Sequence, residues 1–466
     1  MTRIQSPRNV KRMRPSLLAS AVLSLALNAG ATDLLQVWQA ASQHDPQAAV
    51  LEAGRAAGAA RREQAASLWR PTVGLSAAAG RSSADSRMEG AQFSAPGFGQ
   101  STGVDFATSV NGGNATRWAL GVKQPLLDAT RSAQSRQLGI AADAAELEYR
   151  QGRQDWMLQL TQRYFELVLA ERRLALLQQQ HAAVERALVE ARDRFAIGDT
   201  PITDTHEAAA RARGLQAQLV AAGNELELAR QQLADLSGLP ADGLKPLAPS
   251  GGQLTGAVEP LAHWQEQAGR SNPMLLLQQA QLEAASQEVR KHELAGSPTL
   301  DLVAQASRER LSGSGDFGAA SNTQSQQMVG VAFNLPLYTG GWRSARLEES
   351  LRLQDKARAQ LEQVRLQVGQ QTRSAWLALQ SGQARIAALE QALTASQARL
   401  EATRLGRQVG DRTTLDLLNA ENDATAAELA LLQGRVDLLL SRLRLRSFAG
   451  ELDESDLQAV NARLER

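Results

Sequence analysis

The seven residues GDTPITD (198–204) return almost unchanged as GDRTTLD (410–416). Each copy follows a stretch of about 66 residues that contains no proline, 131–197 or 343–408. A helix of that length would be roughly 100 Å long, since each residue adds about 1.5 Å. Because a further helix of about 35 residues is expected after each motif, the sequence predicts two long helical hairpins that turn at these motifs.

The repetition extends over most of the chain. Three pairs of prolines mark corresponding points: Pro46 and Pro273 are 227 positions apart, as are Pro71 and Pro298, whereas Pro125 and Pro336 are 211 apart. One insertion of about 16 residues in the first copy, between 80 and 122, explains the shorter offset. A repeat of more than 200 residues indicates a duplicated domain rather than a short solenoid unit.

Each copy shows the same order of segments: helices broken at a proline, two extended segments around a loop rich in glycine, serine and asparagine, and then the long helix. The predicted boundaries are a first structural repeat over 32–245, a linker over 246–257, a second repeat over 258–451 and a C-terminal tail over 452–466. The predicted elements are strands at about 70–80, 116–125, 298–308 and 327–338, loops at 81–115 and 311–326, long helices at 129–197 and 341–408, and tip hairpins at 198–204 and 409–416.

The extended segments alternate between apolar and other residues. In the second copy, Val329, Val331 and Phe333 alternate with small or polar residues. Segments of about ten residues with one apolar face are typical of strands in a membrane β-barrel, and about eight strands are the fewest that close one. Four strands per chain therefore predict a shared barrel, with eight strands from two chains or twelve from three. A soluble four-stranded sheet beside a soluble helical bundle fits the same pattern.

The first 31 residues have the composition of a secretory signal peptide. Five basic residues precede an apolar run over 17–27, and the sequence Ala-Gly-Ala at 29–31 is an A-x-A cleavage site. Met13 is an alternative start that leaves the signal intact. A membrane anchor is the competing interpretation, but the apolar run is short for a spanning helix.

Composition excludes several classes of function. Without the five basic residues of 1–31, 45 Lys and Arg stand against 49 Asp and Glu, so the mature chain has a net charge of −4 and no basic footprint for nucleic acid. The absence of cysteine excludes disulfides, thiolate metal sites and a lipid on an N-terminal cysteine. The five histidines lack metal-ligand spacing, and the G-x-G-x-x-G match at 313–318 opens no helix. We therefore expect no enzyme activity, cofactor or metal.

The order and spacing of these segments resemble the TolC family of outer-membrane channel-tunnels over essentially the whole mature sequence. The likeness rests on LQVWQAASQHDPQ (35–47), PTL (298–300), LPLYTGG (335–341), RFAIGDTPITD (194–204) and RQVGDRTTLD (407–416). It implies a mainly α fold with a β-barrel. A homotrimer would form a twelve-stranded barrel in the outer membrane and an α-helical tunnel through the periplasm.

The resemblance also implies a function: the outer-membrane exit duct of a tripartite export system, for type I protein secretion or multidrug efflux. The implied partners are outer-membrane lipid, a periplasmic adaptor (membrane fusion protein) and an inner-membrane transporter, either ABC or proton-driven. The alternative is a soluble periplasmic coiled-coil adaptor without a barrel. The sequence does not identify the cargo.

In this family, contacts between neighbouring hairpins hold the periplasmic entrance shut, and the matching positions lie in and beside the two motifs. The resemblance implies that Arg412 contacts Thr203 and Asp204 of a neighbouring hairpin. Arg407 replaces a family tyrosine, and we expect it to pair with Asp204 as well, because charge-assisted hydrogen bonds are stronger than neutral ones.

A ring of acidic residues at the constriction of the family is matched here by Asp416. Asn419 replaces a second ring aspartate, which leaves the cation selectivity of the constriction open. Helix capping is the competing interpretation: Thr413 and Asp416 match a capping box, and Asp204 lies in a first helical turn, where an acid suits the helix dipole. No capping rule requires Arg412, whose alternative role is a solvated charge.

Overall fold

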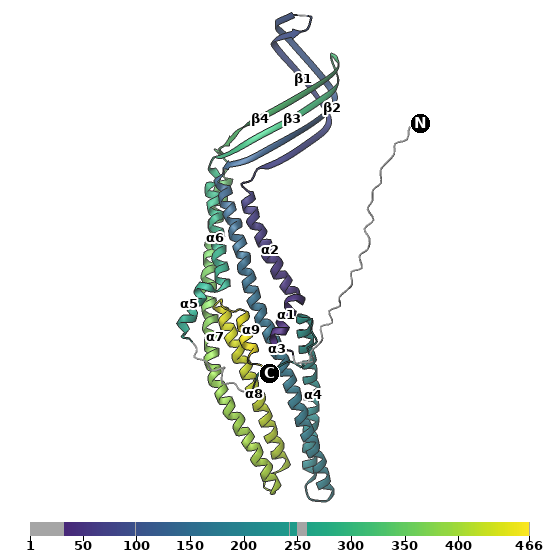
Figure 1. The fold of residues 1–466 in the computed structure, drawn as a ribbon, viewed down its shortest axis with the longest axis vertical. Coiled ribbons are helices and arrows are strands. Elements are labelled where there is room, and N and C mark those ends of the chain that lie inside the picture. Colours follow the sequence, from purple (N-terminus) through teal and green to yellow (C-terminus); the bar gives the residue numbers. More distant parts are fainter. Residues whose placement is uncertain (1–31, 98, 242, 249–258, 466) are drawn as a thin grey trace, which may run out of the picture.

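The computed structural model describes residues 32–97, 99–241, 243–248 and 259–465. The predicted signal peptide (1–31) and most of the predicted linker (246–257) lie outside these residues. The described chain is elongated: a sheet lies at one end, long helices run away from it, and two helical hairpins form the opposite end (Figure 1). None of the helices in the described ranges has the length and apolar character needed to cross a membrane.

Helices and strands follow one another in the same order twice. The first copy consists of α1 (Leu34–His44), α2 (Pro46–Ser67), β1 (Thr72–Ala95), β2 (Gly99–Leu127), α3 (Ala129–Ala196) and α4 (Ile202–Ser237). The second consists of α5 (Leu261–Ser271), α6 (Pro273–Glu293), the 3-10 turn η2 (Leu294–Gly296), β3 (Thr299–Gly315), β4 (Gly318–Asn334), α7 (Trp342–Gln408) and α8 (Thr414–Phe448). A short helix, α9 (Glu454–Asn461), follows.

Local sequence explains why α2 and α6 begin at corresponding points. Asp45 accepts a hydrogen bond from the backbone N–H of Gln47 at 2.9 Å, and Asn272 accepts one from Leu275 at 3.0 Å. A proline follows each of these N-cap residues. Proline suits the first helical position because it has no N–H that would need a partner.

The four strands form one antiparallel sheet in the order β1-β2-β3-β4. The strands are longer than expected, because most of 81–115 and 311–326, predicted as loops, lies within them. These segments consist largely of small and polar residues, whose backbone groups pair across the sheet, and their few large apolar side chains do not alternate regularly. The apolar alternation that marks a strand in a sequence is therefore absent there.

The strand register sorts the side chains of the sheet onto two faces, since paired residues share a face and successive residues alternate between faces. One face, which we call the apolar face, carries large apolar side chains in its rows near the helices. They include Val73, Leu75, Trp118, Leu120, Val122, Leu300, Leu302, Val329, Val331 and Phe333. The opposite, polar face carries mainly small and polar side chains, and Lys123 forms an ion pair there with Asp301 at 2.9 Å.

The β1–β2 hairpin extends beyond the β3–β4 hairpin and bends at that level (Figure 1). A side chain added at Gly113 or Gly313 would meet the Cγ1 atom of Val110, at 2.5 and 3.0 Å respectively. Both glycines belong to the polar face by register. Val110 therefore covers the polar face, and the outer part of the hairpin folds toward that side of the sheet.

The main core lies at mid-length, where helices of both copies meet. Trp156 and Tyr164 of α3 are buried in it, as are Leu457 and Val460 of α9. The Tyr164 hydroxyl donates to the carbonyl of Lys245 at 2.8 Å. The predicted C-terminal tail therefore includes a helix that belongs to the core.

Candidate functional site

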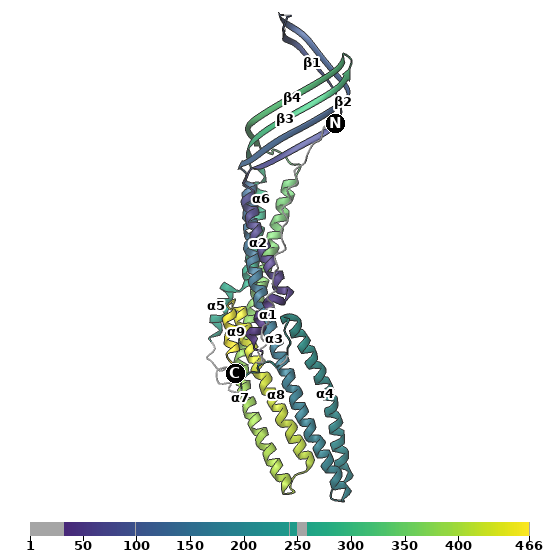
Figure 2. The ribbon, with the colours of Figure 1, turned by 45° about the vertical axis from the view of Figure 1, so that its right-hand side comes forward.

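Both helical hairpins turn through the same backbone geometry, which explains the repeated motif. A glycine has a positive φ in each turn, +76° at Gly198 and +85° at Gly410. The following residues, Asp199 and Asp411, donate their N–H groups to the carbonyl five residues earlier, at 2.9 and 2.8 Å. Glycine adopts this conformation without strain, and helices commonly end in this way. Both turns lie at the end of the molecule farthest from the sheet (Figure 2).

Asp416 forms a capping box at the start of α8. Its Oδ2 atom accepts hydrogen bonds from the N–H of Thr413 at 3.0 Å and from the Thr413 hydroxyl at 2.9 Å. The Asp416 N–H donates in return to Thr413 Oγ1 at 3.1 Å. These hydrogen bonds, together with the charge of Arg412, lower the pKa of Asp416. The single chain thus displays the capping role, and a role in a constriction ring stays a prediction.

Arg412 and Asp204 lie on different turns and do not meet within one chain. The Thr203 hydroxyl donates to Asp204 Oδ1 at 3.5 Å, and Asp204 forms no ion pair with any described residue. Arg412 is exposed, and in the described part of the chain it forms neither an ion pair nor a hydrogen bond. The contact of Arg412 with Thr203 and Asp204 is expected between chains, so it stays a prediction.

Within one chain, Arg407 pairs with a residue other than Asp204, and a pairing of Arg407 with Asp204 between chains stays a prediction. Its guanidinium forms an ion pair with Glu190 of α3, and Glu190 also pairs with Arg194 at 3.1 Å. Arg407 lies in the last turn of α7 and reaches across to α3, whereas Asp204 lies in the first turn of α4. Glu190, rather than Asp204, is therefore the partner of Arg407 within one chain.

Four polar contacts join the first hairpin (α3 and α4) to the second (α7 and α8), and we call them the hairpin ladder. They are the Arg407–Glu190 ion pair, Arg211 Nη1 to Asn419 Oδ1 at 2.7 Å, Gln180 Nε2 to Asn422 Oδ1 at 2.9 Å, and Arg172 Nε to Glu428 Oε1 at 3.0 Å. Next to them, Leu418 of α8 is buried among side chains of α3 and α4. The two hairpins are therefore fastened side by side along their length, while the two turns project freely.

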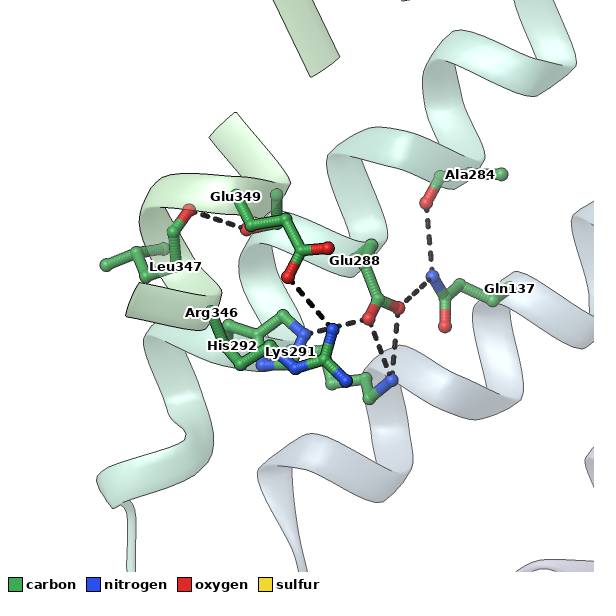
Figure 3. A network of polar contacts seen from close by, with 9 residues as sticks. Gln137, Ala284, Glu288, Lys291, His292, Arg346, Leu347 and Glu349 are labelled. Carbon is green, nitrogen blue, oxygen red and sulfur yellow. Dashed lines mark hydrogen bonds and ion pairs between the residues drawn. The ribbon is translucent and has the colours of Figure 1, made fainter. Parts of the chain in front are cut away.

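A second polar cluster lies at the opposite end of the helices, near the sheet. Glu288 of α6 accepts hydrogen bonds from Gln137 of α3 at 2.8 Å and from Lys291 at 3.0 Å, and its Oε1 atom lies 2.8 Å from His292 Nε2 (Figure 3). Burial alone would raise the pKa of Glu288, but the hydrogen bonds from Gln137 and Lys291 and the charge of Lys291 outweigh it and lower the pKa. This Glu288 cluster fastens α6 to α3.

Among the described residues, no group of three or more histidine, aspartate or glutamate side chains lies close enough together to hold a metal ion. The polar contacts of both clusters are internal pairings between helices or within one helix. They fasten neighbouring helices to one another.

Known proteins share this arrangement. The family model described as "Outer membrane efflux protein" matches residues 37–239 and 264–451. The chain is 28% identical to outer membrane protein TolC of Escherichia coli, over 98% of this chain and 90% of that protein. It is 29% identical to the proteases secretion protein PrtF of Dickeya chrysanthemi, over 74% of each. The Campylobacter jejuni CmeC outer membrane channel has a similar fold, with a TM-score of 0.72 over 99% of this chain and 98% of that chain at 16% identity.

Proposed function

Because the chain belongs to the outer membrane efflux protein family, it is an exit duct in the outer membrane, and we propose that three copies build it. In this assembly, the strands of three sheets close one twelve-stranded barrel, and the helices of three chains enclose a tunnel in the periplasm. The alternative of a soluble adaptor is not favoured, because the matched relatives are named as outer-membrane and secretion proteins.

The apolar face of the sheet is the observation that carries the proposal. From Leu300 to Arg308, β3 rises about 26 Å along its own axis at about 3.3 Å per residue. A strand tilt of about 40° reduces this to a height of about 20 Å, close to the apolar band of about 25 Å in outer-membrane barrels. The polar face, with its Lys123–Asp301 ion pair, suits a water-filled lumen.

The edges of the sheet support a shared barrel. β1 and β4 each pair with only one described strand, so each presents a row of unpaired backbone N–H and C=O groups. Four strands are fewer than the about eight that close the smallest membrane barrels. Pairing β4 of one copy with β1 of the next would satisfy both edges, and three copies would supply twelve strands.

We further infer that the two turns form the periplasmic entrance. Arg412 on one turn and Asp204 beside the other are opposite charges that form no ion pair among the described residues, and a neighbouring copy could supply each counter-charge. Thr203 would accept a further hydrogen bond from the same arginine. Asp416 and Asn419 remain the positions proposed for the constriction. A periplasmic adaptor and an inner-membrane transporter, ABC or proton-driven, would open the entrance and provide the energy.

Native mass spectrometry of the protein extracted in detergent tests the assembly. We expect three chains per particle, and the same particles should form channels in planar bilayers. A stable monomer that conducts would contradict the shared barrel. A particle that stays in solution without detergent would favour the adaptor instead.

A further inference from the structure

Three arginines border the apolar face of the sheet at the end away from the helices. Arg308 lies in one row with Trp118, and Arg310 lies in the next row outward with Thr116. Arg81 follows on β1, one row further out. All three side chains are exposed. They therefore lie where the apolar rows of this face give way to polar rows.

The chain does not balance the charge of these arginines. None of the three guanidinium groups forms an ion pair or a hydrogen bond with another residue of the described ranges. The acidic residues of β3, Asp301 and Glu309, alternate with the arginines and therefore face the polar side, where Glu309 pairs in register with Arg117. In the three paired rows from Trp118 outward to Asn114, the charged side chains on this face are therefore these three arginines.

The position of these arginines indicates what they contact. This step rests on the proposed function, in which the apolar face contacts lipid and the helices extend into the periplasm. The arginines then lie at the headgroup level of the outer leaflet, and Trp118 in the innermost of their rows is a residue type enriched at such interfaces. Arginine presents a planar fork of donors that matches phosphate oxygens in a bidentate manner.

We propose that Arg81, Arg308 and Arg310 form a binding surface for phosphorylated glycolipid headgroups of the outer leaflet, and we call it the arginine belt. Arg308 and Arg310 are about 7 Å apart along β3, and Arg81, two strands to the side and further out, lies roughly 12 Å from Arg310 and roughly 16 Å from Arg308. This spacing lets the belt contact more than one phosphate of a headgroup. Thr116 and Thr323, in one row with Arg310, add hydroxyl donors. Three copies would surround the barrel with three such surfaces.

The test compares wild-type protein with the triple variant Arg81→Gln, Arg308→Gln and Arg310→Gln. Arg117→Gln is the matched control, because Arg117 lies at the same height on the polar face. Native mass spectrometry in detergent, with an added bis-phosphorylated acylated glycolipid, measures the lipid that each trimer retains. Wild type and Arg117→Gln should retain it, and the triple variant should retain at least about tenfold less. Arg310→Gln alone should show a partial loss if the triple variant fails to assemble.

Two further lipids identify the chemistry that is recognised. Wild type should retain the dephosphorylated glycolipid and phosphatidylglycerol much less than the phosphorylated glycolipid. Equal retention of either lipid, unchanged retention by the triple variant, or an equal loss in Arg117→Gln would overturn the proposal. Each sample is also tested for trimer mass and bilayer conductance. A conducting trimer that retains no glycolipid would contradict this inference and leave the proposed function intact. Protein that forms neither trimer nor channel would contradict the proposed function.

Discussion

Arg412 and Asp204 are opposite charges beside the two hairpin turns, and neither forms an ion pair with another residue that the structure describes. In the proposed closed entrance, each Arg412 faces Asp204 and Thr203 of a neighbouring hairpin. A partly exposed ion pair contributes about 0–1 kcal/mol, and a hydrogen bond to a charged group about 1.5–3 kcal/mol. In the proposed trimer, three repetitions of this weak contact would keep the entrance mostly shut, and the binding energy of a partner would be large enough to open it.

Arg412→Ser is expected to raise single-channel conductance in planar bilayers and to make cells leaky to bulky antibiotics, because each copy loses one contact. Adding Asp204→Ala should change little further, since both substitutions remove the same interaction. Trimer yield should stay near that of wild type, because the sheet lies at the other end. Arg373→Ser, at an exposed position in the middle of α7, is the control. Conductance that stays at the closed value in Arg412→Ser would refute the gate.

The ion pair between Arg407 and Glu190 predicts a cross-link within one chain. The chain contains no cysteine, so two introduced cysteines are the only thiols. In Glu190→Cys with Arg407→Cys, a short bifunctional maleimide should join α3 to α7 and leave the product at monomer mass on a denaturing gel. Glu190→Cys alone is the control. Products of two or three chains would show that Arg407 faces a neighbouring copy instead.

The capping box could be predicted from the sequence, whereas the partner of Arg407 within one chain could not. Thr413 and Asp416 are three positions apart, so their spacing alone reveals the hydrogen bonds that they form. Arg407 and Glu190 are 217 positions apart. Their meeting depends on how the second hairpin packs against α3, mainly through α8, and no local pattern in the sequence records that packing.

At the scale of elements, the helices were easier to predict than the strands. Proline and glycine are local signals that end a helix, and α3 (Ala129–Ala196) lies within a residue of the expected 129–197. The strands continue beyond the apolar rows, where alternation of apolar and polar residues ceases. The proposal places the inner part of each strand in lipid, and that part shows alternating apolar residues in the sequence. It places the outer part in water, and that part shows no such alternation.

Glu288 fastens α6 to α3, and its lowered pKa makes this fastening sensitive to acid. Because the folded pKa lies below the ordinary value of about 4.3, the cluster stabilises the fold fully above that value and loses its effect as the pH falls through the folded pKa. The side chain is 33% exposed, so the contribution is at most about 1 kcal/mol per chain.

Wild type should therefore lose thermal stability between neutral pH and about pH 3 more steeply than Glu288→Gln. The midpoint of thermal unfolding of the detergent-solubilised protein measures this at each pH. Glu283→Gln, on the same helix, should keep the slope of wild type. Identical slopes for wild type and Glu288→Gln would show that the carboxylate of Glu288 contributes no acid-sensitive stability.

At the scale of the whole molecule, the duplication gives each chain two strand pairs at one end and two helical hairpins at the other. Each chain contributes one four-stranded sheet and two helical hairpins, so a trimer places twelve strands and six hairpins around one axis. The spacing of prolines revealed the duplication. It did not reveal that the hairpin ladder joins the two copies within one chain, because those contacts depend on the packing of helices far apart in sequence.

The two faces of the sheet allow a direct test of how the proposed barrel sits in the membrane. Val329 lies on the apolar face opposite Ala304, and its neighbour Met328 lies on the polar face opposite Gln305. Val329 is 79% exposed and Met328 46%, so a larger side chain overpacks no core at either position. An arginine facing lipid at the midplane costs about 2–4 kcal/mol in a membrane barrel, and the proposed trimer contains three of them.

Val329→Arg should therefore reduce the amount of assembled trimer in the outer membrane by at least about tenfold, since about 1.4 kcal/mol corresponds to a factor of ten. Met328→Arg should assemble nearly as well as wild type and shift the ion selectivity of the channel toward anions, because the added charge would line the lumen. Gel mobility of unheated membrane extracts measures assembly, and bilayer reversal potentials measure selectivity. Equal assembly of both variants would contradict a lipid-facing apolar face, and failure of Met328→Arg alone would mean that the two faces are reversed.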